Sequence, residues 1–441
     1  MLTVTSARHY RIFVATMALA LVSCGEQEEI LPGKRLHVRA QDSSDIATRP
    51  SSRVAFSAPA QSVATAWTHK AGGPQHRIAH QAFSASPRLA WSADIGEGNR
   101  RRNRITADPV VAADRVFTLD SLSNATATST DGRRLWSVDL TPSSEKSGDA
   151  SSGGLAIAGN SLYVTTGYGE VHALDADTGG TRWKQRLDAA ATGAPTVHGG
   201  LVYLVTRDNT AWGISADNGR VRWRLPGTPS VAGLSGASAP AVTDGIAVFP
   251  FGSGEVVGAL PQGGVRLWGS SVSGQRRGRV YARISDITAD PVILGDVIYT
   301  GNQSGRAVAM ELHSGERIWT AEHGPYEPVW VAGGSIFLVS DQARLVRLNA
   351  STGETIWAVD LPYFRRDQAR RRKGIFAHYG PVLAGGRLWV ASDNGDLNGF
   401  DPATGEIVET LDIPGGAASN IAVANRTMYL VSAKGNLLAY R

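Results

Sequence analysis

Residues able to carry out chemistry are sparse in this sequence. Cys24 is the only cysteine among 441 residues, which excludes a disulfide within the chain and any metal site built from several thiolates. No Gly-rich phosphate loop, nucleophile elbow or pair of catalytic carboxylates stands out. The sequence therefore favours a binding protein over an enzyme, and it predicts no cofactor and no metal site. The histidines show no metal-ligand spacing and fall at His69, His76, His80, His172, His198, His313, His323 and His378, among others.

Cys24 closes an N-terminal segment typical of protein export. A positively charged start at residues 8–11 precedes an apolar stretch at residues 12–22, which is too short for a comfortable transmembrane helix. The sequence LVSC that ends this segment resembles a bacterial lipobox, which implies cleavage before Cys24 and a diacylglyceryl thioether on its sulfur. Gly25, in place of an aspartate, favours the outer membrane by similarity to enterobacterial sorting rules. We predict a lipoprotein signal peptide at residues 1–23; an ordinary secretory signal with an incidental cysteine is the alternative.

The region after the signal differs from the rest of the chain. Residues 24–86 are rich in Ser, Ala, Gln, Pro and Arg without a sustained apolar period, so we interpret them as a lipidated flexible tether. The formal net charge of +5 is small for this length, and basic residues gather at 100–104, 275–279 and 365–373. Solvated loops are the favoured interpretation of these runs, with contact to anionic lipid head groups as the alternative. Export argues against a nucleic-acid partner.

A repeat runs through the remainder of the chain. Each copy has Ala-Pro or a variant, two apolar strands separated by a Gly turn, an acidic turn with Gly, and a Trp four residues later, as in 193–223 and 327–357. A later copy keeps Gly405 but has Glu409 in place of the Trp. Even spacing favours packing between repeats, rather than ligand contact, as the role of these Trp residues. The Gly and Trp keep one offset at Gly132/Trp136, Gly179/Trp183, Gly219/Trp223, Gly264/Trp268, Gly315/Trp319 and Gly353/Trp357.

The repeat length predicts the fold. Copies recur about every 45 residues between Trp91 and Glu409, which is the length of a four-stranded propeller blade. The last copy ends at Arg441 without its final strand, whereas the segment 87–92 reads as a final strand without the ones before it. We therefore predict an all-β, eight-bladed β-propeller of four-stranded antiparallel blades over residues 87–441. The N-terminal strand is expected to complete the last blade and close the ring, which would leave no open sheet edge.

The repeat also resembles a known family. Its motif, seen as DADTGGTRW at 175–183 and NASTGETIW at 349–357, is similar to that of the quinoprotein (PQQ) dehydrogenase-like propellers. Together with the lipobox, the span 87–441 resembles the BamB family of lipoproteins of the β-barrel assembly (BAM) machinery, especially its α-proteobacterial members. The long region before the repeats and the basic run at 365–373 are less typical of that family.

The resemblance implies a function. It implies a periplasmic scaffold, anchored by lipid to the periplasmic face of the outer membrane, that binds the POTRA domains of BamA and assists folding and insertion of outer-membrane β-barrel proteins. It further implies contacts with other BAM components, with unfolded outer-membrane proteins as possible substrates, and a monomer within a hetero-complex.

Partner-binding residues in that family lie on two neighbouring loops between blades. The first corresponds here to residues 229–236, where Leu234 matches the second leucine of a family pair. Val231 matches the first leucine only if one residue is inserted, and Ser235 stands where the family has an arginine. That last difference weakens a charge-based contact on this loop.

The second loop corresponds to residues 283–288, RISDIT, which resembles the family pattern RLSDVD. Arg283, Asp286 and Ile287 match the pattern, and Thr288 replaces its second acid. Exposed apolar residues of the first loop beside this carboxylate would form a small apolar hot spot with a polar edge. The alternative is that Asp286 caps a turn and that the leucine of the first loop packs locally.

Two other functions fit the same fold. A PQQ-dependent dehydrogenase would need a calcium cage of Glu, Asn and Asp and a catalytic carboxylate at the ring axis, and many such enzymes carry a vicinal disulfide. The single cysteine excludes that disulfide. A propeller that binds carbohydrate or peptidoglycan stays open.

Overall fold

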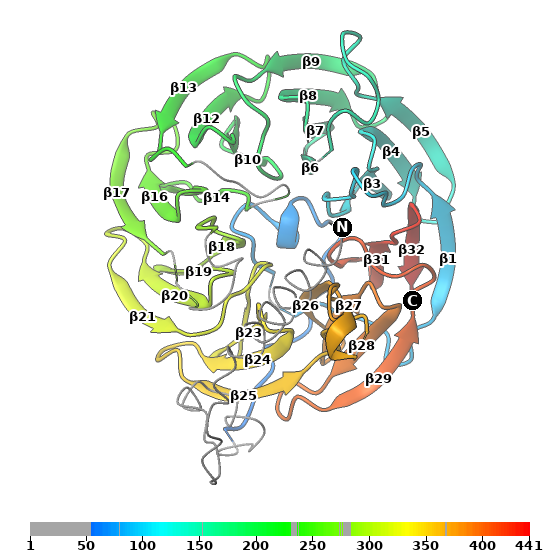
Figure 1. Ribbon diagram of the computed structural model, residues 1–441. Helices are drawn as coiled ribbons and strands as arrows, with labels where there is room; N and C mark the ends of the chain where they lie inside the picture. Colours follow the sequence, from blue (N-terminus) through cyan, green and yellow to red (C-terminus); the bar gives the residue numbers. More distant parts are fainter. Residues whose placement is uncertain are drawn as a thin grey trace, which may run out of the picture. The chain divides into compact units, whose positions relative to one another are not determined.

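Eight four-stranded antiparallel sheets are arranged around a ring in the computed structural model (Figure 1). The structure describes residues 54–78, 80–151, 153–230, 236, 238–272, 274, 276, 284–366 and 368–441. All of them fall in one unit of the chain, Thr48–Arg441. The predicted eight-bladed propeller of four-stranded antiparallel blades is therefore confirmed.

The sheets follow one another along the chain, each built from its innermost strand outward. The first four are β2 (Val110–Ala112), β3 (Arg115–Leu119), β4 (Asn124–Ser129), β5 (Arg134–Asp139); β6 (Gly153–Ala158), β7 (Ser161–Thr166), β8 (Glu170–Asp175), β9 (Thr181–Arg186); β10 (Thr196–His198), β11 (Leu201–Val205), β12 (Thr210–Ser215), β13 (Val221–Pro226); and β14 (Ala241–Val242), β15 (Ala247–Pro250), β16 (Glu255–Ala259), β17 (Arg266–Ser271).

The remaining four sheets follow in chain order, except that the last sheet has β1, which precedes all the other strands in the sequence, as its fourth strand. They are β18 (Ala289–Leu294), β19 (Val297–Asn302), β20 (Arg306–Glu311), β21 (Arg317–Ala321); β22 (Trp330–Ala332), β23 (Ser335–Val339), β24 (Arg344–Asn349), β25 (Thr355–Asp360); β26 (His378–Ala384), β27 (Arg387–Ser392), β28 (Asp396–Phe400), β29 (Ile407–Asp412); and β30 (Ala422–Ala424), β31 (Thr427–Val431), β32 (Asn436–Tyr440), β1 (Leu89–Asp94). Two short 3-10 helices fall within the described residues, η1 (Lys70–Gly72) and η3 (Ala369–Arg371).

Burial explains the two kinds of strand in each repeat. The second strands β7, β11, β23 and β31 are buried along their whole length, because blades cover both of their faces. Outer strands such as β9 and β13 alternate between exposed and half-buried residues instead. In the part of the chain that is described, no helix is long and apolar enough to cross a membrane.

The repeated Trp and Gly residues form the joints between blades. Trp136 donates its indole N–H to the carbonyl of Ala176 in the next sheet at 3.1 Å, and Trp183 donates in the same way to Ala216 at 2.9 Å. A Cβ on Gly179, whose φ is +75°, would lie 2.8 Å from the Trp136 ring. The Gly therefore serves both a left-handed turn and a close contact with the ring of the preceding blade. This arrangement agrees with the predicted packing role of these Trp residues.

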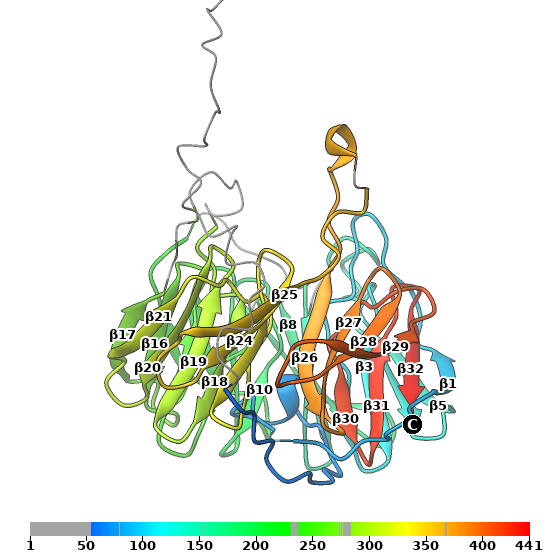
Figure 2. The ribbon, with the colours of Figure 1, turned by 90° about the horizontal axis from the view of Figure 1, so that it is seen from below.

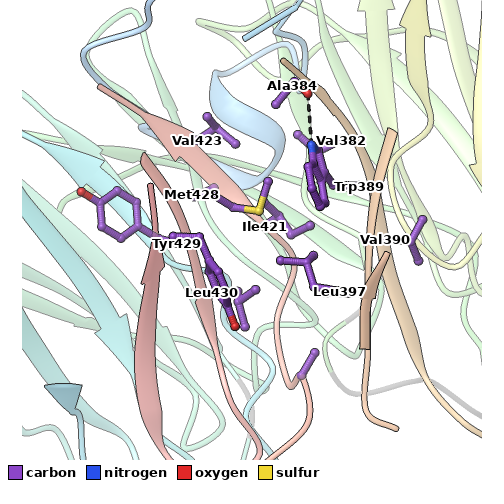
Figure 3. Close-up of a cluster of buried hydrophobic side chains, with 14 of the residues drawn as sticks. Val382, Ala384, Trp389, Val390, Leu397, Ile421, Val423, Met428, Tyr429 and Leu430 are labelled. Carbon is purple, nitrogen blue, oxygen red and sulfur yellow. Dashed lines mark hydrogen bonds between the residues drawn. The ribbon is translucent and has the colours of Figure 1, made fainter. Parts of the chain in front are cut away.

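The joint between the seventh and eighth sheets is built differently, since Glu409 replaces the Trp. Figure 3 shows Leu397 and Trp389 of the seventh sheet facing Met428 and Leu430 of the eighth, within one buried apolar cluster. The Trp389 indole N–H donates to the Ala384 carbonyl of its own sheet at 3.1 Å. Buried apolar side chains pack across this joint, while Glu409 forms an ion pair with Arg387 of its own sheet.

Strand β1 runs antiparallel to β32 as the fourth strand of the last sheet. Trp91 lies opposite Ala439 and Asp94 lies opposite Asn436. The Trp91 indole N–H donates to the carbonyl of Thr130 in the first sheet at 3.1 Å. This strand therefore makes the same kind of joint as the other outer strands.

The predicted tether at residues 24–86 is wrong for its second part. Residues 54–78 and 80–86, here called the axial segment, pack against the propeller, and η1 lies at the centre of the ring (Figure 1). Trp67 is 1 % exposed, and Arg347 donates to the carbonyls of Val54 and Ala55 at 3.0 and 3.2 Å. The sequence misled because an extended segment that fills a channel needs no apolar period. Residues 24–53 lie outside the described part.

The axial segment pairs with the free edges of the innermost strands. In each of five consecutive sheets, one residue of the innermost strand donates its backbone N–H to the axial segment. The bonds are Val111 to Trp67 O (2.8 Å), Ile157 to Thr68 O (2.9 Å), Val197 to His69 Nε2 (3.0 Å), Val242 to Pro74 O (2.8 Å) and Ile293 to Gln75 O (3.1 Å). Buried backbone donors that strand pairing leaves over are satisfied in this way.

Candidate functional site

Side chains from four blades meet around Lys70 on the ring axis. Lys70 Nζ lies 2.9 Å from Asp290 Oδ2 and 3.4 Å from Glu327 Oε2. Asn420 donates its backbone N–H to Asp108 Oδ1 at 2.7 Å, and its Nδ2 donates to Glu327 Oε2 at 2.6 Å. Asp108, Glu327 and Asn420 stand just before innermost strands, and Asp290 lies in one. The fold thus collects three carboxylates and an amide about one cation.

The electrostatics of this cluster follow from its burial. Burial raises the pKa of Asp108 despite the opposing effect of Lys70, and burial raises the pKa of Glu327 to about 7. Burial by itself would lower the pKa of Lys70, but the attraction of Asp290, Glu327 and Asp108 outweighs it and raises that pKa. The ammonium therefore stays charged, and the carboxylates depend on it for compensation.

The axis is filled by the chain itself. Trp67 stacks on Trp330 with ring centroids 6.4 Å apart and planes 16° from parallel. Cavities beside Lys70 and Trp67 have volumes of about 10 and 20 Å³, room for about one water molecule each. Ligand pockets usually measure about 300 Å³ or more. A wider hollow of about 830 Å³ lies off the axis beside Phe83 and Arg426. Within the described residues, no group of three His, Cys, Asp or Glu side chains is placed to hold a metal.

His69 is held neutral by its hydrogen bonds. Its Nε2 accepts the Val197 N–H at 3.0 Å, while its Nδ1 lies 2.8 Å from Thr68 Oγ1. In a protonated ring Nε2 would carry a hydrogen and could no longer accept the Val197 N–H, so two donors would face each other. Burial, with repulsion from His76, lowers the pKa of His69 to about 3, and burial also lowers the pKa of His76. Both rings contribute to the axial packing only while uncharged.

The first predicted partner loop connects β13 to β14. Val231, Leu234 and Ser235 lie outside the described residues, as does Arg283 of the second loop. The two connections belong to neighbouring blades, as the family pattern requires. Both lie on the face that carries the connections between blades, here called the connection face.

The second loop connects β17 to β18, and its predicted site residues are not exposed. Asp286, Ile287 and Thr288 are 1, 2 and 5 % exposed. Ile287 belongs to an apolar cluster between blades, and Thr288 Oγ1 donates to the Pro325 carbonyl at 2.6 Å. The expectation of a surface carboxylate is therefore wrong, because the chain already turns into the ring here to begin β18. Ser285, just before these residues, is half-buried.

Sequence reasoning missed the axial cluster, although a signal for it exists. Asp108, Asp290 and Glu327 each stand directly before a Pro at the start of a repeat, where other repeats have Ala or Gly, as in Ala194 and Ala239. An acid at a position that the fold directs to the axis requires a cation. The partner, Lys70, lies in a region without repeats, so no spacing connects it to the acids.

Replacing Lys70→Met should lower the free energy of unfolding by about 3–5 kcal/mol, because it leaves buried carboxylates without compensation. Denaturant unfolding of the full mature chain measures this. Arg134→Met is the control, since Arg134 lies 3.7 Å from Asp94 in an exposed pair and should cost less than about 1 kcal/mol. Adding Asp290→Asn to Lys70→Met should recover part of the loss. Equal stability of Lys70→Met and the parent protein would contradict a structural role for the cluster.

The neutral state of His69 predicts a pH dependence. The pKa of His69 in the folded protein, about 3, lies below the ordinary value of 6.5. The contribution of the neutral ring to the free energy of unfolding is therefore fully present above pH 6.5 and is lost as the pH falls toward 3. His69→Gln, which keeps an acceptor for Val197, should reduce the slope of stability against pH in this window by about 1.4 kcal/mol per pH unit. Unfolding measured across the window tests this, with exposed His313→Gln as the control. An unchanged slope in His69→Gln would show that the ring titrates normally.

Solved structures resemble the fold. BamB from Moraxella catarrhalis matches with a TM-score of 0.64 at 19 % identity, covering 81 % of this chain and 98 % of that one. A quinohemoprotein alcohol dehydrogenase from Comamonas testosteroni matches with a TM-score of 0.65 at 14 % identity, covering 85 % and 80 %. At these identities the likeness establishes the propeller alone.

Sequence comparison is more specific. The family model described as outer membrane protein assembly factor BamB matches residues 121–359 and 364–441. BamB of Salmonella typhimurium is 34 % identical over 334 residues, which cover 73 % of this chain and 80 % of the relative. BamB of Escherichia coli K12 is 32 % identical over 360 residues, covering 79 % and 87 %. The family model matches more than half of the chain, and the matched residues lie in the eight-bladed propeller. The chain therefore belongs to the BamB family of outer membrane protein assembly factors.

Proposed function

We propose that this protein is a scaffold of outer-membrane assembly that binds the POTRA domains of BamA and works with other BAM components on outer-membrane β-barrel proteins. The observation that carries the proposal is the family match over residues 121–359 and 364–441. A lipid on Cys24 would hold it at the periplasmic face of the outer membrane. Contact with unfolded outer-membrane proteins belongs to the same proposal.

The proposed interface consists of the two neighbouring connections β13–β14 and β17–β18. Buried Asp286 and Thr288 would hold the second connection in shape rather than contact the partner. Asn302 Nδ2 also helps to fix this connection, since it donates to the backbone carbonyls of Ser285 and Asp286 at 3.1 and 3.2 Å. Val231, Leu234, Ser235 and Arg283 would then supply the side-chain contacts.

A quinone-dependent dehydrogenase is not favoured as an alternative. Its cofactor would need the ring axis, where Lys70 and Trp67 lie in this chain. The dehydrogenase-like structures share 14 % identity with the chain, against 32–34 % for the BamB relatives above. A buried ammonium between carboxylates stabilises a scaffold and leaves no substrate site at that position.

We further infer that the pairing of β1 with β32 closes the ring of the protein in solution. The indole bond from Trp91 to Thr130 supports this, because it repeats the joint of the other blades across the two ends of the propeller. Closure would remove the sheet edges that could otherwise pair with unfolded β-barrel substrates.

The double variant Val231→Ala/Leu234→Ala should weaken binding to a POTRA fragment of BamA more than tenfold. An apolar anchor at the centre of an interface contributes about 2 kcal/mol or more. Calorimetry of the purified partners measures the affinity. Val63→Ala is the control, because Val63 is also an exposed apolar residue, 47 % accessible, but lies in the axial segment. Unchanged affinity of the double variant, with an unchanged melting temperature, would move the interface elsewhere.

Replacing Cys24→Ala should release the protein from the membrane fraction and abolish its labelling by palmitate, since the chain has no other cysteine to carry the thioether. Fractionation of cells that express each form checks both effects. Palmitate labelling that persists in the variant, or a parent protein found wholly in the soluble periplasmic fraction, would refute the anchor. POTRA binding in solution should be the same for both forms.

A further inference from the structure

A basic hairpin rises from the connection face between β25 and β26. Figure 2 shows it, residues 361–377 with η3 at its tip, standing out from the ring on the side away from the axial segment. The axial segment runs on the opposite side. Gly333 and Gly385 lie in turns between the first two strands of their sheets, which are on that side, and a Cβ on either glycine would contact Ser57 or Phe83 of the axial segment. Among the described residues, this hairpin stands out furthest from its face in Figure 2.

The hairpin concentrates the charge of the protein. Between residues 365 and 373 the sequence has six basic residues and one acid, so this segment has a formal charge of +5, equal to that of the whole chain. Arg365 forms an ion pair with Asp393 at the base. Four other basic residues are exposed and form no ion pair with any described residue: Arg366, Arg370, Arg371 and Lys373.

Backbone hydrogen bonds join the two sides of the hairpin at its base. The Arg365 N–H donates to the Gly374 carbonyl at 3.0 Å, and the Phe376 N–H donates to the Tyr363 carbonyl at 2.9 Å. The Arg372 guanidinium lies 5.0 Å from the Phe364 ring centroid. Cation–π contact of this kind helps to fix the arginine beside the ring.

We propose that this hairpin binds the head groups of anionic phospholipids at a membrane surface. An anionic membrane surface attracts each Lys or Arg of a cluster by about the same amount, and the protein needs no shaped pocket for this interaction. Exposed Ile375, 47 % accessible, adds an apolar group beside the charges, as in other surface-bound membrane segments.

The membership of the chain in a family of outer-membrane assembly factors makes a bilayer the available anionic surface. The inference goes beyond the proposed scaffold function and does not need its lipid anchor. Its test therefore uses the full mature chain with Cys24→Ser, which has no thiol to lipidate. If this form did not bind lipid, binding of the POTRA domains would be unaffected. The two proposals are therefore tested independently of each other.

The experiment is co-sedimentation with vesicles of phosphatidylcholine, with and without one third phosphatidylglycerol. We expect binding only to the vesicles that contain phosphatidylglycerol, and loss of that binding at high salt. The triple variant Arg366→Ala/Arg370→Ala/Arg371→Ala should bind about a hundredfold more weakly, because each basic residue near an anionic surface contributes a factor of about five. Replacing the same three residues with Lys should preserve binding, since a lipid surface responds to charge rather than to guanidinium geometry.

A matched control removes the same charge elsewhere on the connection face. Arg101→Ala/Arg102→Ala/Arg104→Ala changes three exposed arginines of the connection between β1 and β2. It should bind vesicles like the parent protein. Equal loss in both triple variants would overturn the proposal, because it would mean attraction by overall charge. Absence of binding by the parent protein would also overturn it and would direct the search to an acidic protein surface. Melting temperatures of all variants exclude unfolding as the cause.

Discussion

The free edge of the innermost strands is the constraint on which this structure depends. Strand pairing within a sheet satisfies one side of each innermost strand, and the other side faces the ring axis with its backbone donors unused. Here the axial segment accepts such N–H groups from Val111, Ile157, Val197, Val242 and Ile293. A buried donor without an acceptor costs about 1–3 kcal/mol, so five of them would be a large share of the stability of a domain.

This use of the axis decides where function can lie. In an enzyme on this fold the axis would hold the reactive group, but here Lys70 and Trp67 occupy it, and the two cavities beside these residues each have room for about one water molecule. Recognition is left to the faces of the ring. The connection face carries both the proposed partner loops and the basic hairpin, so one side of the molecule would meet the assembly complex and a membrane surface at different points of its circumference.

The sequence predicts the propeller well because its information is repeated. Each Gly and Trp pair, such as Gly179 with Trp136, recurs at a fixed spacing and reports a local joint. The axial segment is not repeated, and its contacts join residues far apart in the chain, such as Lys70 and Glu327, so no local pattern reveals it. The expected surface position of Asp286 is wrong for a related reason: a loop motif gives the residue type, whereas the burial of that residue depends on how the chain enters the next blade.

Amide hydrogen exchange of the full mature protein tests most directly whether the axial segment is part of the folded core. The Trp67 N–H donates to Val111 O at 2.7 Å and the Gln81 N–H donates to Leu383 O at 3.1 Å. If the segment pairs with the innermost strands, these amides are protected about as strongly as those of β11 or β31 and exchange together with them. Exchange of both amides at the rate of an unfolded peptide, while β11 and β31 stay protected, would contradict the account.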